Sequence, residues 1–215
     1  MVSGIDESIR HFGGTAQALL DDAFISQVRG PYNPFGPAAA SRNADCLVAS
    51  SLMVAWLRGH GARPSTPGGI VDSIEAARLL ATGKLEHGRG VTLAEGRDLL
   101  RQLGVDARVV HGINDVLDVV RDGRPAILTV RMDHAPRGPG TWSERSYHAR
   151  SAALGIDHWP GDHAIAVGAW DSSSGTYGIL DPMAVNGPFP ATADELAYSN
   201  FLRAAGREMA GIVPE

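Results

Sequence analysis

The chain has 215 residues and a formal net charge of −5, with 44% hydrophobic and 20% charged residues. These proportions are those of an ordinary globular protein with a sizeable core. The acidic balance excludes the basic footprint of a nucleic-acid-binding protein, and no run of 18 apolar residues is present to span a membrane. We therefore expect no nucleic-acid partner and no membrane segment.

A single domain is predicted over residues 1–215, because this length fits one domain. Residues 1–10 are polar and lack the basic start and apolar centre of a secretory signal. Three interpretations stay open: a cytoplasmic protein, a protein exported without a cleaved signal peptide, or a part of a longer protein.

Helices come first along the chain and strands later, which indicates an α+β fold with N-terminal helices packed on a C-terminal antiparallel sheet. The predicted elements in chain order are helices over 16–28, 46–57, 71–81 and 93–103, a strand over 107–110, a helix over 113–121, strands over 126–130, 163–170 and 176–180, and a helix over 193–205.

Local signals support three of the predicted helices. The spacing of Ile74, Ala77 and Leu80 predicts an apolar helix face. Thr92 and Glu95 fit a capping box at the start of the next helix. Asn114 is a candidate cap for the helix over 113–121.

Three segments lack periodicity and are predicted as loops. A Gly/Pro/Ala-rich approach loop over 30–40 ends an N-terminal region of residues 1–39, and a Pro/Gly turn region covers 62–69. The long segment 133–160 has no clear period. Since long aperiodic loops in compact domains are usually lids or binding loops, we predict that it shapes access to a substrate.

Cys46 is the only cysteine, which excludes an internal disulfide and a cysteine-rich zinc site. It opens the apolar helix 46–57, and Asn43 and Asp45 before it are residue types that cap helices. Backbone N–H groups and the helix dipole lower the pKa of a thiol at this position. By itself, however, a cysteine on an apolar helix is more often a small buried hydrophobe.

His163 and Asp181 are predicted at the same end of a β-hairpin. His163 opens the strand 163–170, and Asp181 directly follows the strand 176–180, so the two can be neighbours across the pair. Asp162 would point to the opposite face, because side chains alternate along a strand. Together with Cys46 these residues supply the thiolate, imidazole and orienting group of a cysteine hydrolase.

Histidines raise the question of a metal. His148, His158 and His163 have a spacing that zinc sites on loops can use. No carboxylate stands at a clear ligand spacing, so we predict no metal and no cofactor.

The order of several short motifs resembles that of the papain-like cysteine peptidases of the C39 type. In that family a Cys helix, a Leu-Gly helix end, a Gly-x-Pro strand start, a His-x-x-x-Val-Gly strand and a closing Asp-Pro follow one another. The corresponding segments here are Asp45-Cys46, Leu103-Gly104, Gly123-Arg124-Pro125, His163 to Gly168 and Asp181-Pro182. The resemblance covers roughly residues 40–185 as the core. It implies a papain-like fold with Cys46 as nucleophile, His163 as base and then acid, and Asp181 as orienting group.

Two positions depart from the pattern of that family. The residue after the nucleophile is usually Gly and is Leu47 here, and a Gln about six residues before the nucleophile is replaced by Ala40. The Gln amide helps to hold the oxyanion, so Asn43 becomes the candidate oxyanion donor, with Asn33 a more remote amide. The alternatives are that the Cys46 N–H works with another donor, or that the protein is a weak or non-catalytic relative.

A second, looser resemblance is to papain-fold toxin domains that deamidate glutamine, through Asn33-Pro34, Asn43 and Asp181-Pro182. The sequence therefore predicts a cysteine hydrolase that acts on a peptide or protein substrate through a thioester. A glutamine-deamidase effector or a non-catalytic peptide-binding module on the same fold are the alternatives. A toxin would have an inhibitory or immunity protein as a partner.

Overall fold

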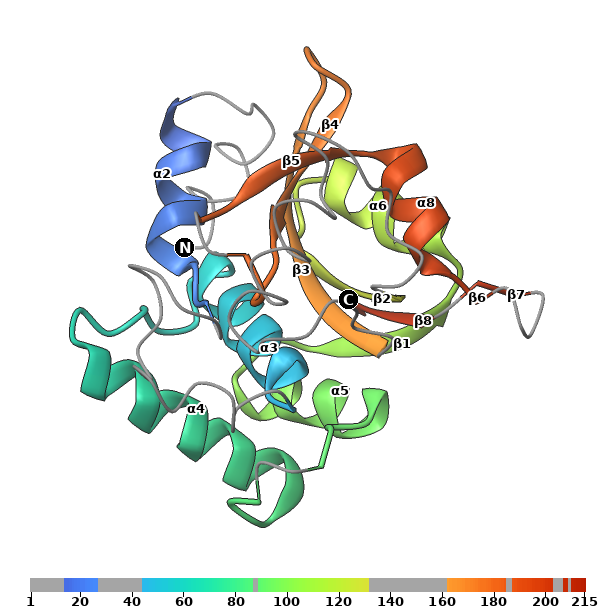
Figure 1. Cartoon of the computed structure of the whole chain (residues 1–215). Helices are drawn as coiled ribbons and strands as arrows, with labels where there is room; N and C mark the ends of the chain where they lie inside the picture. The colour runs from blue at the N-terminus through green and yellow to red at the C-terminus, as the bar shows by residue number, and fades with distance from the viewer. Residues whose placement is uncertain are drawn as a thin grey trace, which may run out of the picture.

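A six-stranded antiparallel sheet with the strand order β1-β8-β2-β3-β4-β5 forms the centre of the fold, and helices cover it (Figure 1). The computed structural model describes residues 14–26, 44–86, 89–131, 162–184, 187–202, 207–208 and 210–215. The helices are α2 (Gly14–Ala23), α3 (Cys46–Leu57), α4 (Pro67–Thr82), α5 (Leu93–Gln102), α6 (Ile113–Arg121) and α8 (Ala193–Asn200). The strands are β1 (Ala107–His111), β2 (Ala126–Arg131), β3 (Asp162–Asp171), β4 (Thr176–Leu180), β5 (Phe189–Thr192), β6 (Phe201–Leu202), β7 (Arg207–Glu208) and β8 (Ala210–Pro214).

The predicted α+β class is confirmed, with helices α2 to α5 gathered beside the sheet (Figure 1). Helix α3 is the central one, since it packs on β3 and also contacts α2, α4 and α5. Helices α5 and α6 lie on opposite faces of β8. An added Cβ at Gly211 would meet Val116 of α6, whereas Ile212 reaches Gly96 of α5.

Capping chemistry fixes the start of two helices. The predicted capping box of α5 is confirmed, because Thr92 accepts from the Glu95 N–H and Glu95 accepts from the Thr92 N–H. Helix α4 begins earlier than predicted, at Pro67 inside the expected turn region. Thr66 caps it by accepting from the Gly69 N–H, and a proline is favoured in the first helical turn.

Two other helix predictions were wrong in detail. Helix α2 ends at Ala23, not at position 28, because the buried segment that follows makes tertiary bonds instead: the Ile25 N–H donates to Met53 Sδ, and Ser26 Oγ donates to the Ala184 carbonyl. Asn114 does not cap α6. Gly112 occupies the N-cap position and provides no side-chain bond.

The apolar face of α4 also differs from the prediction. Ile70, Ile74 and Ala77 are buried as expected, but Leu80 is 49% exposed. The next buried position is occupied by Arg78, whose side chain is 1% exposed. The true stripe therefore follows the i, i+4, i+7, i+8 spacing, with a charged residue at its end.

The hairpin over residues 162–180 forms as predicted, and β4 has the predicted bounds. The C-terminal part was wrong: the helix predicted over 193–205 ends at Asn200, and strands β5, β6, β7 and β8 were missed. β8 inserts between β1 and β2 and pairs with both, so the central sheet extends to residue 214.

Because β8 joins two parts of the sheet, we expect its central side chain to matter for stability. Ile212 is fully buried and pairs with Val109 on one side and Ile127 on the other. Ile212→Ala should lower the free energy of unfolding by about 2–5 kcal/mol, as measured by urea denaturation. The half-buried Val109→Ala is the control and should cost clearly less. Equal losses would contradict a special role of β8.

Among the described residues, none of the helices combines the length and the hydropathy needed to cross a bilayer. The single domain over 1–215 stays a prediction. The approach loop over 30–40 and the long loop over 133–160 lie outside the described residues.

Candidate active site

Cys46 is the first residue of α3, as the sequence predicts. This helix is apolar on all sides, and nearly all of its later residues are buried. Such a helix holds its first turn firmly in place, because its packing leaves it little room to move. Cys46 as a whole residue is partly buried, and it is not in a disulfide. The helix therefore gives the free thiol a fixed position.

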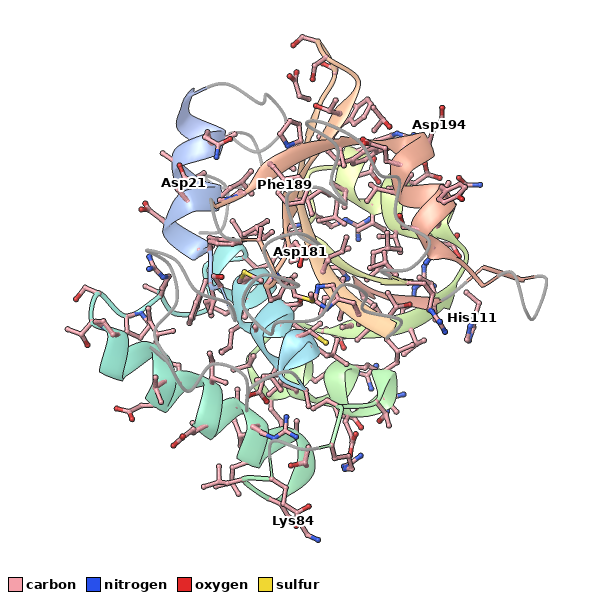
Figure 2. The ribbon with its side chains drawn as sticks, in the orientation of Figure 1. Asp21, Lys84, His111, Asp181, Phe189 and Asp194 are labelled. Atoms are coloured by element: carbon pink, nitrogen blue, oxygen red, sulfur yellow. The ribbon has the colours of Figure 1, made fainter. Side chains whose placement is uncertain are left out.

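His163 and Asp181 lie on the neighbouring strands β3 and β4 and face each other. In the register of the two strands Ala166 pairs with Leu180, which puts Asp181 one step further along, on the same face as His163 and diagonal to it. His163 Nε2 lies 2.6 Å from Asp181 Oδ1. In Figure 2, Asp181 lies in the interior of the fold, and its side chain is 0% exposed against 2% for His163.

Asp181 is held in turn by its own backbone neighbourhood. Its Oδ1 also accepts from the Met183 N–H at 2.8 Å, and its carbonyl accepts from the Ala184 N–H at 2.8 Å. An aspartate that accepts from the residue two positions later is the common Asx turn. The turn after β4 thus fixes the carboxylate that meets the imidazole.

The Cys46 thiol forms a side-chain hydrogen bond with His163. Since Nε2 of the imidazole is directed at Asp181, the nitrogen left for the thiol is Nδ1. The structure therefore brings the three predicted residues together in one linear arrangement, with the imidazole in the middle.

The electrostatics of this arrangement favour an ion pair between thiolate and imidazolium. Burial alone would raise the pKa of Cys46, but the hydrogen bond and charge of His163, with backbone N–H groups of Ala164 and Leu47, bring it below its ordinary value. Burial would likewise lower the pKa of His163. The charge and hydrogen bond of Asp181, together with Cys46, instead raise it to about 9. Together the two shifts favour the proton on the imidazole over the proton on the thiol.

A short bridge joins α3 to β3 at this point. The Ala164 N–H supports the Cys46 sulfur, and Ser50 Oγ, one turn further along α3, donates to the Ala164 carbonyl at 3.1 Å. Ser50 is fully buried. This bridge fixes the helix that carries the thiol against the strand that carries the imidazole, and sequence reasoning did not identify it.

Leu47, at the position where the family that the sequence resembles usually has Gly, is directed into the core. Its side chain is 3% exposed and packs on α5, where an added Cβ at Gly96 would lie 2.7 Å from Leu47 Cδ2. The absence of a side chain on α5 thus makes room for the one on α3. Only the backbone N–H of Leu47 serves the thiol.

We expect Gly96→Ala to lower the free energy of unfolding by about 1–3 kcal/mol, because the added methyl group overpacks the contact with Leu47. Leu47→Ala in the same chain should recover part of this loss, as double-mutant analysis of urea denaturation would show. Gly68→Ala in α4 is the matched control, since nothing lies within 4 Å of its added Cβ. Additive effects of the two changes would contradict the contact.

Asp45 is not the helix cap that the sequence suggests. It occupies the N-cap position of α3 with φ −96° and ψ 6°, makes no side-chain capping bond, and is fully buried. Its Oδ1 instead accepts from Arg78 Nη1, a buried ion pair between the residue before the thiol and α4. The buried arginine at a core-facing helical position is a signal that the sequence does contain.

Other candidates cannot be placed. Asn43, the predicted oxyanion donor, lies outside the described residues, as do Asn33, His148 and His158. Within the described part of the chain, no group of three or more His, Cys, Asp or Glu side chains could hold a metal ion.

Comparison with known proteins supports the fold. No family model matches the chain, and no curated protein matches it. A solved structure from Bacillus anthracis, assigned as a C39-like peptidase, aligns with a TM-score of 0.50 and 14% identity over 89% of this chain and 94% of the other. A double-glycine-motif protease from an AMS/PCAT transporter, solved with its leader peptide, aligns at 13% identity over 79% and 84%, with a TM-score of 0.41 that is too low to support a conclusion. The chain has the papain-like fold of C39-like peptidases.

Proposed function

We propose that this protein is a cysteine hydrolase that cleaves peptide or amide bonds, most closely a C39-like peptidase, with Cys46, His163 and Asp181 as its catalytic residues. The observation that carries the proposal is the line of hydrogen bonds from the thiol through His163 to Asp181, with a 2.6 Å contact at its buried end. The fold shared with a C39-like peptidase supports it.

The proposed reaction starts from the ion pair. The Cys46 thiolate attacks the carbonyl carbon, and the negative charge moves to the carbonyl oxygen. The imidazolium of His163 then gives its proton to the leaving nitrogen, the carbon–nitrogen bond breaks, and a thioester remains. Neutral His163 next takes a proton from water, which attacks the thioester and releases the acid and the thiolate. Asp181 stabilises the imidazolium throughout, as the raised pKa of His163 reflects.

Support for the oxyanion comes from the start of α3. The N–H of a first-turn residue has no partner within the helix, so the Cys46 N–H is suited to meet the developing negative charge. Whether the site cleaves a backbone amide or a glutamine side chain depends on the substrate. Both reactions share the thioester and differ only in the nitrogen that leaves.

The test is mass spectrometry of a proteome digested with the wild-type protein and with Cys46→Ala. New peptide termini that appear only with the wild type would support a peptidase. A change of about 1 Da at glutamine, again only with the wild type, would instead assign a deamidase. A separate sample of the wild type is first shown to react with iodoacetamide near pH 6, so that its thiol is known to be reactive. If this protein and Cys46→Ala then give identical spectra, hydrolysis is excluded and a binding module remains.

A further inference from the structure

We propose that Arg78 is a positioning residue for Cys46: by holding the Asp45 carboxylate, it keeps that carboxylate away from the start of α3 and leaves the first N–H groups of the helix to the thiol and its oxyanion. This inference deepens the proposed function and rests on it. It assigns a role to a residue on α4 that touches none of the reacting atoms.

The contacts of Arg78 show that its guanidinium is built into the region before the thiol. Nη1 donates to the Asp45 carboxylate and to the Ala44 carbonyl at 3.4 Å, so it binds the two residues that lead into Cys46. Nε donates to the Glu86 carbonyl at 2.5 Å, and Nη2 to the Arg89 carbonyl. The planar guanidinium thus ties the approach to α3 to the connection between α4 and α5, a task that one ammonium group could not perform.

Helix α4 buries the charged side chain of Arg78 while two neighbouring leucines stay partly exposed. Leu79 and Leu80, the next two residues of α4, are each 49% exposed, whereas Arg78 is buried. Burying a charged side chain in place of an available leucine costs free energy unless the charge has a specific partner. This choice conflicts with the local hydrophobic pattern, and such conflicts concentrate at functional sites.

The carboxylate of Asp45 explains why a positive charge is needed at the position of Arg78. An aspartate at an N-cap normally turns its carboxylate onto the N–H groups of the first turn. Here that would bring a negative charge to the same N–H groups that surround Cys46, and it would oppose both the thiolate and an oxyanion. The carboxylate makes no such bond, because it is paired with Arg78. The Leu47 N–H supports the sulfur instead.

The charged groups around the thiol belong to three parts of the fold. His163 on β3 contacts it directly, and Asp181 after β4 stands behind His163. Asp45 precedes it in the chain, and Arg78 faces Asp45 from α4. Removing Arg78 takes away the positive charge that faces Asp45 next to Cys46 in the chain, so the thiolate should become harder to form.

The test follows the alkylation of Cys46 by iodoacetamide as a function of pH, with folding checked by circular dichroism at each pH. In Arg78→Gln the midpoint should move up by about one pH unit, so alkylation below the midpoint becomes roughly tenfold slower. The double variant Arg78→Gln/Asp45→Asn should return to the wild-type midpoint, since the negative charge is removed together with the positive one. Arg78→Lys keeps the positive charge near Asp45 but cannot make all the contacts of the guanidinium, so its alkylation midpoint should stay near that of the wild type while its thermal stability falls. A purely structural role for Arg78 would change thermal stability without moving the midpoint.

Arg89→Gln is the matched control. It removes an exposed arginine of the same connection, whose side chain pairs with Glu95, and leaves the Arg89 carbonyl in place, so its midpoint should equal that of the wild type. A wild-type midpoint in folded Arg78→Gln, or no recovery in the double variant, would overturn the proposal. If Arg78→Gln does not fold, Asp45→Asn decides: the unpaired Arg78 charge should move the midpoint to lower pH, and an unchanged or higher midpoint would overturn it.

These measurements follow the thiol and not hydrolysis. A protein that cleaves nothing but shows the predicted shifts would contradict the proposed function and leave the role of Arg78 intact. A protein that hydrolyses its substrate but shows none of these shifts would contradict the role of Arg78 and leave the proposed function intact.

Discussion

His163→Ala is expected to lower the alkylation rate of Cys46 at pH 6 by roughly 100-fold or more, because the thiol loses the hydrogen bond and charge that lower its pKa. Any hydrolysis should fall by at least about 10⁴-fold, since the acid and the base of the reaction are the same residue. In the wild type, the ion pair should persist as pH rises until His163 loses its proton near its pKa of about 9. Rates of iodoacetamide modification between pH 4 and 10 would measure both effects.

The matched control for this change is His111→Ala. His111 ends β1 and is exposed, and Figure 2 shows it at the outer edge of the fold. Its removal should leave the alkylation profile unchanged. If His163→Ala kept a wild-type rate at pH 6, the activated thiolate would have another origin, and the proposed ion pair would be wrong.

Asp181→Asn is expected to have the second largest effect. The carboxylate is the strongest cause of the raised pKa of His163, so its loss should return that pKa from about 9 toward or below 6.5. The imidazole would then be neutral at pH 7.5, and the thiol would hold its own proton more of the time. Loss of the orienting aspartate typically lowers kcat by about 10⁴-fold in the serine-protease triad.

The measurement that identifies this cause is the alkaline limb of the pH profile of Cys46 alkylation by iodoacetamide. It should move to lower pH in Asp181→Asn, while the fold is kept because an asparagine oxygen can still accept from the Met183 N–H. Asp171→Asn at the other end of the same hairpin is the control, since that carboxylate accepts hydrogen bonds from the turn residues Ser173 and Ser174, away from His163. An unchanged alkaline limb in Asp181→Asn would show that Asp181 does not set the charge of His163.

The hairpin that carries His163 and Asp181 could be predicted because its signals are local. A continuous apolar run after His163, a turn at Asp171 to Gly175 and a strand end before Asp181 all lie within about twenty residues. His163 and Asp181 come close to Cys46 because α3 packs on β3. An apolar helix and an apolar strand are expected to pack in this way, since both bury apolar surface.

Non-local features could not be predicted in this way. β8 contains a glycine and a proline in five residues, which argues against a strand, yet Gly211 is required there: an added Cβ would lie 2.5 Å from Val116 and 2.7 Å from the Ile127 carbonyl. Arg78 was missed for a similar reason. Its spacing fits the buried stripe of α4, but only its distant partner Asp45 explains why a charge belongs there.

The position of β8 has a consequence for how the chain reaches its native state. β1 pairs with a strand roughly 100 residues later, and β1 and β2 are joined in one sheet only through that strand. Pairings between such distant segments fold slowly, because a large loop must close before any bond is gained. Within this sheet β8 is the strand made latest, after the hairpin of β3 and β4. The sheet can therefore close only once the segment 210–214 is available to pair with both β1 and β2.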